Sequence, residues 1–390
     1  MTVRVGPAPL TAAEVVAVAR GREPIELTEE SLAEMARSRA IVEDLAESPE
    51  PAYGISTGFG ALATVHIPPE SRAHLQESLI RSHAAGWGPE VEPEVVRATM
   101  LLRLHTLATG RTGVRPSTAQ AYAAMMNAGI LPVVCEHGSL GCSGDLAPLS
   151  HIALALTGEG EVRDRTGALV PAADALAAAG LAPVKLAEKE GLALINGTDG
   201  MLGMLVLALA DLEVLLTTAD ISAAMSIEAL LGTDRVLADD LQQLRPHPGQ
   251  RISAANMRRV LRDSPVVASH AGPEDTRVQD AYSLRCAPQV NGAARDTADY
   301  CAIVAGRELA AAVDNPVVTL DGRVESNGNF HGAPVAYALD FLAIPVADVA
   351  SMSERRTDRM LDRHRSHGLP PFLAHEAGVD SGHMIAQYTA

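Results

Sequence analysis

The sequence predicts a mainly α-helical fold, and three observations support this. Capping-box patterns mark helix starts near the N-terminus, at residues 11–14 and 31–34. Apolar residues recur at helical spacing over long stretches at 201–231, 293–313 and 333–363. No segment shows convincing alternation of apolar and polar residues between turn signals, so we expect strands to be few and short.

Further helices in the first half of the chain have their own boundary signals. Leu75, Leu79 and His83 lie four residues apart, which predicts a helix between 70 and 86 whose apolar stripe includes the histidine. Proline and glycine residues at the expected ends, or a preceding glycine-rich loop, predict three more helices, over 94–108, 118–128 and 145–156.

Two glycine-rich loops, 54–60 and 138–144, interrupt the helical pattern. The stretch 158–183 contains glycine and proline residues and is an acceptable boundary between two domains. We therefore expect two domains: a loop-rich N-terminal region over 1–185, and a bundle of long helices over 186–390.

Composition excludes several classes of protein. Apolar residues make up 47% of the 390 residues and charged residues 20%, which is typical of a globular chain with a sizeable core. The net charge of −17 would repel a nucleic acid backbone. The 4 cysteines form no C-x-x-C pair, and the N-terminus has no apolar segment of a secretory signal, so we expect a cytoplasmic protein. The longest uninterrupted apolar stretch, 201–210, is too short to span a membrane.

Common catalytic and cofactor motifs are missing. We find no glycine-rich nucleotide-binding pattern and no spacing of residues typical of a metal site. The sequence Gly141-Cys-Ser-Gly-Asp145 departs from a serine hydrolase elbow at its last position. Cys142 could be a nucleophile, although no histidine is assigned to it by the sequence.

The segment from Gly138 to His151 is the most informative part of the chain. On the simplest interpretation it is a tight loop before a helix, and Ser143 only caps that helix. A second interpretation uses the backbone, because the amide of Gly144 has no Cβ beside it and could attack the carbonyl of residue 142. Loss of water from Ser143 would then leave an electrophilic methylene group, and the side chain of Cys142 would not be consumed.

This segment resembles the signature of the aromatic amino acid ammonia-lyases, in which Ala-Ser-Gly cyclises to a methylidene-imidazolone; Cys142 here replaces the alanine. Five other segments resemble motifs of the same family and occur in the same order. They are Tyr53–Gly60, Leu75–Gly86, Leu192–Thr198, Val278–Cys286 and Ser326–Gly332.

The resemblance implies a carbon–nitrogen lyase with the helical architecture shared by ammonia-lyases and fumarases. It also implies a methylidene-imidazolone formed from Cys142, Ser143 and Gly144, without metal or nucleotide. Tyr53 is similar to the base that removes the β-proton, and Tyr282 to a second tyrosine of the site. The positions similar to those that contact substrate or prosthetic group are His83, Asn196, Gln279, Arg285 and Phe330.

Each of these residues also has an ordinary interpretation. Taken alone, Arg285 would be a surface arginine, Asn196 a turn or cap residue and Phe330 a core residue. His83 alone would be a histidine satisfied by hydrogen bonds on a packed helix face. Only the surrounding motifs favour a function.

The pair Ser82-His83 indicates the substrate, because it resembles the members of the family that act on histidine. An imidazole can exchange a hydrogen bond with a substrate imidazole, which the leucine of other members cannot. We therefore expect conversion of L-histidine to trans-urocanate and ammonia, the first step of histidine degradation. A phenylalanine or tyrosine ammonia-lyase, or an aminomutase, remains an alternative.

The resemblance further implies a homotetramer, with active sites built from several subunits. Relatives continue past Ala390 through helices that carry an active-site glutamate, so we expect a C-terminally truncated chain. This leaves one more alternative, a catalytically silent helical oligomer.

Overall fold

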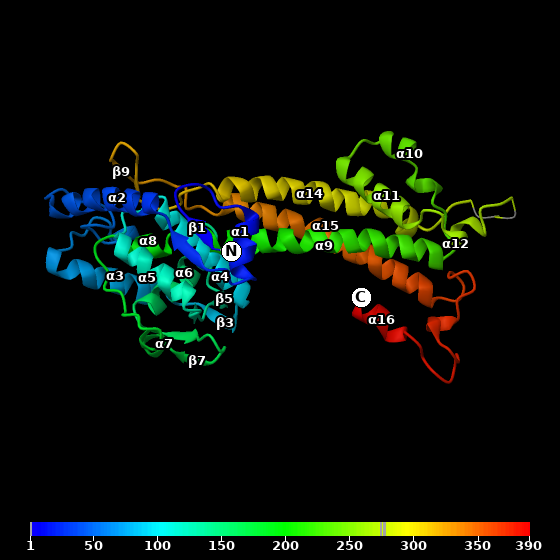
Figure 1. Cartoon of the computed structure of the whole chain (residues 1–390), viewed down its shortest axis with the longest axis horizontal. Helices are drawn as coiled ribbons and strands as arrows, with labels where there is room; N and C mark the ends of the chain where they lie inside the picture. Colours follow the sequence, from blue (N-terminus) through cyan, green and yellow to red (C-terminus); the bar gives the residue numbers. More distant parts are fainter. Residues whose placement is uncertain (1, 274, 276–277) are drawn as a thin grey trace. The chain divides into compact units, whose positions relative to one another are not determined.

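The computed structural model describes residues 2–273, 275 and 278–390 and is mainly helical, which confirms the predicted fold class (Figure 1). The chain divides into two compact units. One comprises Met1–Leu207 with Val304–Tyr337, and the other Ala208–Ile303 with Ala338–Ala390. The domain boundary expected between residues 185 and 186 stays a prediction.

Among the described residues, eight helices lie wholly within the first unit. Their bounds are α1 (Ala12–Ala19), α2 (Glu29–Glu47), α3 (Pro69–His83), α4 (Pro93–Ala108), α5 (Pro116–Asn127), α6 (Leu146–Leu156), α7 (Ala172–Ala178) and α8 (Glu190–Ile195). The central one is α4, which is buried at every position from Ala98 to Ala108. Because α1, α2 and α5 all pack against it, an all-round apolar sequence is stable there.

One of the two predicted capping boxes is correct. Thr11 accepts a hydrogen bond from the Glu14 amide at 3.2 Å, and the Glu14 carboxylate accepts one from the Thr11 amide at 2.8 Å. The prediction at residues 31–34 is wrong, because α2 already begins at Glu29. Thr28 supplies the capping oxygen three residues earlier and accepts from the Ser31 amide at 3.1 Å.

The strands are short, as predicted, and those in the described part of the chain form four small sheets. The pairs are parallel β1 (Val3–Val5) with β2 (Ile25–Leu27), and antiparallel β3 (Trp87–Glu90) with β5 (Cys135–His137) and β8 (Val317–Val318) with β9 (Val324–Glu325). The fourth sheet has the order β4 (Leu131–Pro132), β6 (Glu161–Arg163), β7 (Leu169–Pro171). Single 3₁₀ turns are η1 (Gly60–Leu62), η2 (Arg235–Leu237) and η3 (Pro371–Leu373).

Three long helices contribute residues to both units: α9 (Asp199–Ala229), α14 (Ala287–Glu308) and α15 (Ala333–Leu361). The predicted stretches 201–231 and 333–363 agree with α9 and α15. The helix predicted over 293–313 is wrong at both ends, because α14 starts at Ala287 and stops at Glu308. The Val313 carbonyl is bound by the Arg103 guanidinium instead of a helical amide, an interaction that no local pattern reveals.

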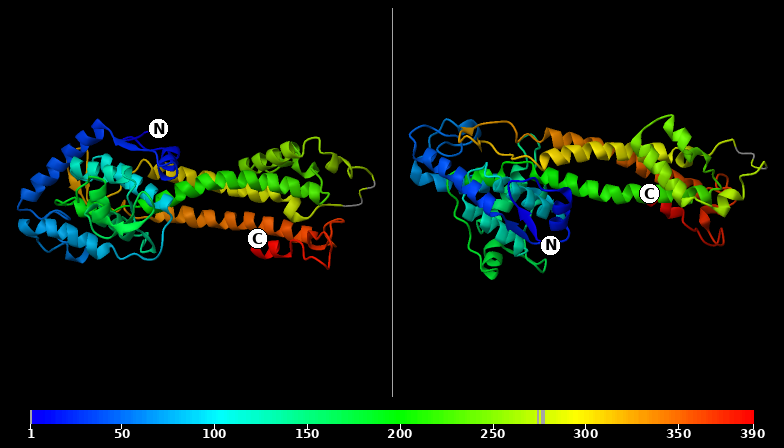
Figure 2. Two further views of the ribbon diagram at one scale, coloured as in Figure 1. Left: turned by 60° about the horizontal axis from the view of Figure 1, so that its bottom comes forward. Right: turned by 45° about the horizontal axis from the view of Figure 1, so that its top comes forward.

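The second unit also contains α10 (Asp239–Gln243), α11 (Pro248–Val260), α12 (Pro265–Ala268), α13 (Tyr282–Arg285) and α16 (Met384–Thr389). In this unit α9 and α14 lie side by side (Figure 2). The buried carboxylate of Asp220 on α9 accepts from Asn291 at 2.9 Å and Arg295 at 2.6 Å, both on α14. Asn256 on α11 donates to the same carboxylate at 2.8 Å, so one acidic group joins three helices.

Two helical segments, Glu190–Ala229 and Ala333–Leu361, are long and apolar enough to cross a membrane by length and composition alone. Core helices of globular proteins satisfy the same criterion, so this is weak evidence for a membrane protein.

Candidate active site

The loop that carries Cys142, Ser143 and Gly144 is a tight turn before α6. The Cys142 amide donates to the Leu140 carbonyl at 2.8 Å, and Gly141 and Gly144 face each other as an isolated antiparallel bridge. Both glycines have positive φ, +71° and +75°, a conformation that disfavours any residue with a Cβ. Cys142 is exposed and Ser143 is half-buried.

Backbone hydrogen bonds join this loop to two other predicted motifs. The Asp145 amide donates to the Gly197 carbonyl at 2.7 Å, and the Gly332 amide donates to the Gly141 carbonyl at 2.7 Å. A Cβ on Gly144 would lie 2.2 Å from the Gly197 oxygen and 3.4 Å from the Phe330 oxygen. The fold therefore brings together the loop, the Asn196 segment and the Phe330 segment, which are far apart in the sequence.

The close approach of Gly144 and Gly197 leads to a prediction. Gly144→Ala is expected to lower the free energy of unfolding by about 2 kcal/mol, because its Cβ adds both a clash and positive-φ strain. The matched control is Gly328→Ala, since a Cβ on Gly328 would have no atom within 4 Å. Urea unfolding of both variants measures the difference. Equal stability of the two would contradict the packing described here.

Asp145 has a role that sequence reasoning missed. It precedes α6, but its carboxylate caps α9, where it accepts from the amides of Gly200 at 2.7 Å and Met201 at 3.1 Å. The Ser139 hydroxyl donates to the same carboxylate at 2.7 Å. Burial raises the pKa of Asp145 to about 6, while these hydrogen bonds act in the opposite direction. The carboxylate thus fastens the loop to the start of a long helix.

This raised pKa gives a pH dependence with a defined sign. The ordinary pKa is 3.8, so the unfolded chain releases this proton at lower pH than the folded protein does. The stability contributed by Asp145 is full below about pH 4 and is lost as the pH rises through about 6, with a loss of about 3 kcal/mol. We expect Asp145→Asn to remove this fall in the free energy of unfolding, which urea unfolding between about pH 4 and 7 would measure. The exposed Asp174→Asn should leave the profile unchanged, and an unchanged profile in Asp145→Asn would refute the assignment.

Asn196 is buried and held from several directions. Its side-chain nitrogen donates to the Asn315 carbonyl at 3.1 Å, and to Asp314 in a longer contact of 3.5 Å. Asp314 forms an ion pair with Lys189 at 2.6 Å, and both side chains are fully buried. Arg103 donates to the carbonyl of Asn196 at 3.0 Å. Asn196 is therefore positioned by residues that the motifs alone did not indicate.

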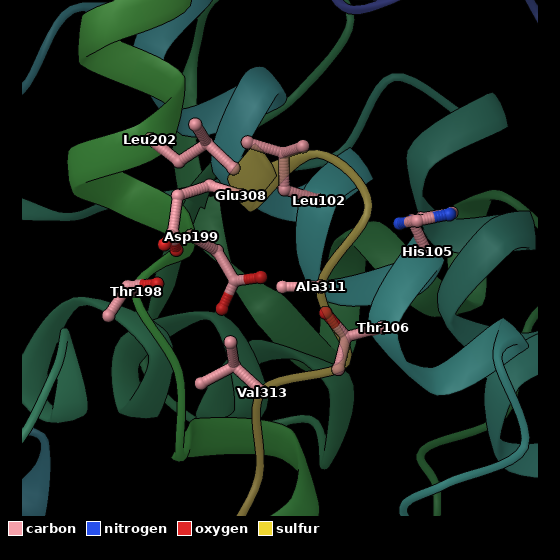
Figure 3. Close-up of a pocket in the computed structure, with 9 residues that line it drawn as sticks. All are labelled: Leu102, His105, Thr106, Thr198, Asp199, Leu202, Glu308, Ala311 and Val313. Atoms are coloured by element: carbon pink, nitrogen blue, oxygen red, sulfur yellow. The ribbon is translucent and has the colours of Figure 1, made fainter. Parts of the chain in front are cut away.

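Arg103 also forms an ion pair with Asp199 at 2.9 Å, directly after the Asn196 segment. Asp199 lines a small cavity together with Thr198, His105 and Glu308 (Figure 3). The cavity holds about 10 Å³, which is at most the space of one water molecule. Burial raises the pKa of Asp199 and of Glu308 and lowers that of His105. This cluster is too small to bind a substrate.

Tyr53 starts the first glycine-rich loop and is half-buried. Its hydroxyl oxygen accepts from the Gly60 amide at 3.2 Å, and its ring meets the edge of Phe59 with centroids 6.1 Å apart. Gly54, with φ of +73°, packs against the side chain of Leu192. The loop is thus anchored on α8, the helix that ends beside Asn196.

His83 is the last residue of α3. Its Nδ1 lies 2.9 Å from both the Leu79 carbonyl oxygen and the Ser82 hydroxyl oxygen, whereas Nε2 makes no hydrogen bond with a described residue. The segment that follows approaches the loop. A Cβ on Gly138 would lie 3.2 Å from Gly86 Cα, and the Gly86 amide donates to His151 Nε2 at 3.0 Å.

The other three predicted residues, Gln279, Tyr282 and Arg285, belong to the second unit. Gln279 is exposed, and Tyr282 is 71% exposed. The Arg285 guanidinium carbon lies 4.5 Å from the centre of the Tyr282 ring, and Arg285 Nε donates to the Asp280 carbonyl at 2.9 Å. Tyr282 and Arg285 are the first and last residues of the single helical turn α13.

Within the described part of the chain, no group of three or more histidine, cysteine, aspartate or glutamate side chains is placed to hold a metal ion. The acidic residues near the loop accept hydrogen bonds from backbone amides, as Asp145 does, or pair with arginine, as Asp199 does.

The model of the aromatic amino acid lyase family matches residues 10–390. The chain is 66% identical over 388 residues to a histidine ammonia-lyase of Streptomyces coelicolor, covering 100% of this chain and 76% of that relative. Among solved structures, it is similar to a tyrosine aminomutase of Streptomyces globisporus, with a TM-score of 0.91 and 39% identity over 100% of this chain and 76% of the other. A histidine ammonia-lyase of Trypanosoma cruzi gives 0.89 and 38%, over 100% and 72%.

Proposed function

Because the chain belongs to the aromatic amino acid lyase family, we propose that it is a histidine ammonia-lyase, which converts L-histidine to trans-urocanate and ammonia. It is a carbon–nitrogen lyase, and its substrate is an amino acid. The observation that carries the proposal is the set of backbone contacts that gathers the 142–144 loop with the Asn196 and Phe330 segments.

The residues of the loop fit the methylidene-imidazolone of this family. Ser143 has the β-hydroxyl that dehydration needs, and the turn at Gly144 leaves no room for a Cβ. The side chain of Cys142 is exposed, so it does not obstruct the turn. When present, the group supplies an electrophile for the amino group of the substrate. The chain's own residues must then bind the carboxylate, orient the side chain and remove the β-proton.

We assign proton removal to Tyr53, which is held by the Gly60 amide and the Phe59 ring. Arg285 is suited to bind the substrate carboxylate. Its Nε donates to the Asp280 carbonyl, and its two terminal nitrogens make no hydrogen bond with a described residue, so they stay available. Tyr282, stacked on Arg285, would orient it. Asn196 and Gln279 supply polar contacts, and Phe330 lines the pocket.

His83 is the residue we assign to substrate choice. Its Nδ1 contacts the Leu79 carbonyl and the Ser82 hydroxyl, which leaves Nε2 available to exchange a hydrogen bond with a substrate imidazole. His83→Leu is expected to lower kcat/KM for L-histidine by about tenfold to a hundredfold, because the hydrogen bond to the substrate imidazole is lost. Steady-state kinetics with L-histidine and L-phenylalanine check this. Ser78→Ala, a change at a half-buried residue of the same helix, is the control, and equal kinetics for both variants would contradict the assignment.

The direct test of the function is turnover of L-histidine, L-phenylalanine and L-tyrosine by the purified chain. Fastest turnover of L-histidine, with urocanate as the product, supports the proposal. A preference for L-phenylalanine or L-tyrosine would favour a related ammonia-lyase, and a β-amino acid product would favour an aminomutase. No turnover at all would favour a silent helical oligomer.

Two further properties are part of the proposal. We propose a homotetramer, supported by large apolar side chains exposed along the long helices, namely Val214, Ile221, Met225, Tyr300, Ile303, Tyr337, Phe341 and Ile344. We also propose a cytoplasmic location, supported by the four free cysteines.

A further inference from the structure

The first unit contains a second, much larger cavity, of about 780 Å³, that the proposed reaction does not use. Its walls come from β2, α4, β4 and the turn after β6. Much of the lining is apolar, and Val96, Met100 and Ile130 are nearly inaccessible to solvent. This volume and lining suit an organic molecule of intermediate size.

Arginine side chains are concentrated around this cavity. Four arginines line it against three acidic residues, Glu23, Glu90 and Asp164. Glu90 is paired with Arg163 at 2.6 Å. Asp164 is turned toward its own loop, where one carboxylate oxygen accepts from the Thr166 and Ala168 amides at 2.8 and 3.0 Å. Glu23 has an interaction of its own.

The other three arginines are not neutralised in this way. Arg22 and Arg165 make no hydrogen bond or ion pair with any residue that the structure describes. Arg97 uses Nε to donate to the Ala19 carbonyl, and its terminal nitrogens make no hydrogen bond or ion pair with described residues. Burial and the positive charge of Arg22 lower the pKa of Arg97 from its ordinary value, while the Glu94 carboxylate acts in the opposite direction. Cations that repel one another across a cavity are better accommodated when an anion lies between them.

The cavity is connected to the candidate active site by the ribbon of β3 and β5. At one end, Glu90 and Val91 line the cavity, and the Val91 amide donates to the Val134 carbonyl at 2.8 Å. At the other end, Trp87 pairs with His137. Trp87 follows His83 closely in the chain, and His137 precedes the loop that carries Ser143. A ligand that shifts one end of this short ribbon would therefore displace both predicted active-site segments.

We propose that this cavity is an effector site for an organic phosphate, whose phosphate group is bound by Arg22, Arg97 and Arg165 while its apolar body occupies the apolar floor. A phosphate fits better than a carboxylate, because three guanidinium groups supply more charge and more donors than one carboxylate can use. The effect on turnover rests on the proposed function, whereas binding does not.

The experiment uses 1-naphthyl phosphate as the probe, with calorimetry on the full chain. Inorganic phosphate and 1-naphthol are the matched ligands, since each carries one half of the probe. The variant is Arg22→Gln with Arg165→Gln. Both side chains are exposed, so the substitutions should not prevent folding. The control is Arg4→Gln, an exposed arginine of the same unit outside the cavity.

We expect the probe to bind the unmodified chain and Arg4→Gln with Kd below about 1 mM, and the double variant at least about tenfold more weakly. Each half ligand should bind more weakly than the probe. At saturating probe, kcat/KM should change at least about twofold in the unmodified chain and not in the double variant. Absence of binding, equal binding by the double variant, or displacement of the probe by L-histidine would overturn the site. Binding without any change in turnover would overturn the effector role, and inactivity with intact binding would count against the proposed function alone.

Discussion

Ser143→Ala is expected to reduce ammonia release from L-histidine by about three orders of magnitude or more. Alanine has no hydroxyl to lose as water, so the electrophilic methylene group cannot form. In this variant, the proteolytic peptide that spans residues 142–144 should have the mass calculated from its sequence. In the parent chain, that peptide is expected to be lighter than calculated, because cyclisation and dehydration each remove water.

Cys142→Ala is the matched control for this prediction. Its side chain is adjacent, exposed and not consumed in the cyclisation, so turnover and the mass deficit should both persist. If Ser143→Ala keeps its activity, or if the unmodified chain shows no mass deficit, the proposed chemistry of the loop is wrong. Loss of activity in Cys142→Ala with the deficit intact would instead assign the cysteine a direct role.

Lys189→Met is expected to lower the free energy of unfolding by about 3 to 5 kcal/mol. Lys189 and Asp314 are both fully buried and lie 2.6 Å apart, so removing the ammonium group leaves a buried carboxylate without its counter-charge. Asp314 also contacts Asn196, and turnover should therefore fall along with stability. Urea unfolding and steady-state kinetics measure the two effects.

The exposed Lys185→Met is the control and should change stability by less than about 0.5 kcal/mol. The double variant Lys189→Met with Asp314→Leu should recover part of the lost stability, because an apolar pair replaces the ion pair without leaving a bare charge. It should not recover turnover, since Asn196 loses its contact with Asp314. If Lys189→Met alone is as stable as Lys185→Met, the ion pair between Lys189 and Asp314 does not stabilise the fold.

Local sequence signals were sufficient for much of the fold. Pro93 and the apolar residues after it predict α4 to within one residue of its observed bounds, because proline suits the first helical turn and leucine-rich stretches favour helix. Where local signals competed, the prediction failed. Ser31 and Glu34 resemble a capping box, but Thr28 offers the same oxygen earlier in the chain and α2 starts there.

The candidate site was also only partly predictable from local sequence signals. Ser143, Gly144 and His83 were indicated by motifs, since their chemistry depends on residue type and on neighbours in the chain. The capping of α9 by Asp145 and the burial of Lys189 against Asp314 had no local signal, because the partners lie 55 and 125 positions apart. The arginines around the large cavity likewise come from three separate segments.

By itself, the sequence determined the residue types of the reacting loop, the positions of most helices and the family resemblance, all of which depend on order along the chain. Only the tertiary structure decided which carboxylate caps which helix, which charges are buried in pairs, and which arginines surround one cavity. The physical reason is that hydrogen bonds and charge pairs act over a few ångströms in space, whatever the separation of their partners in sequence.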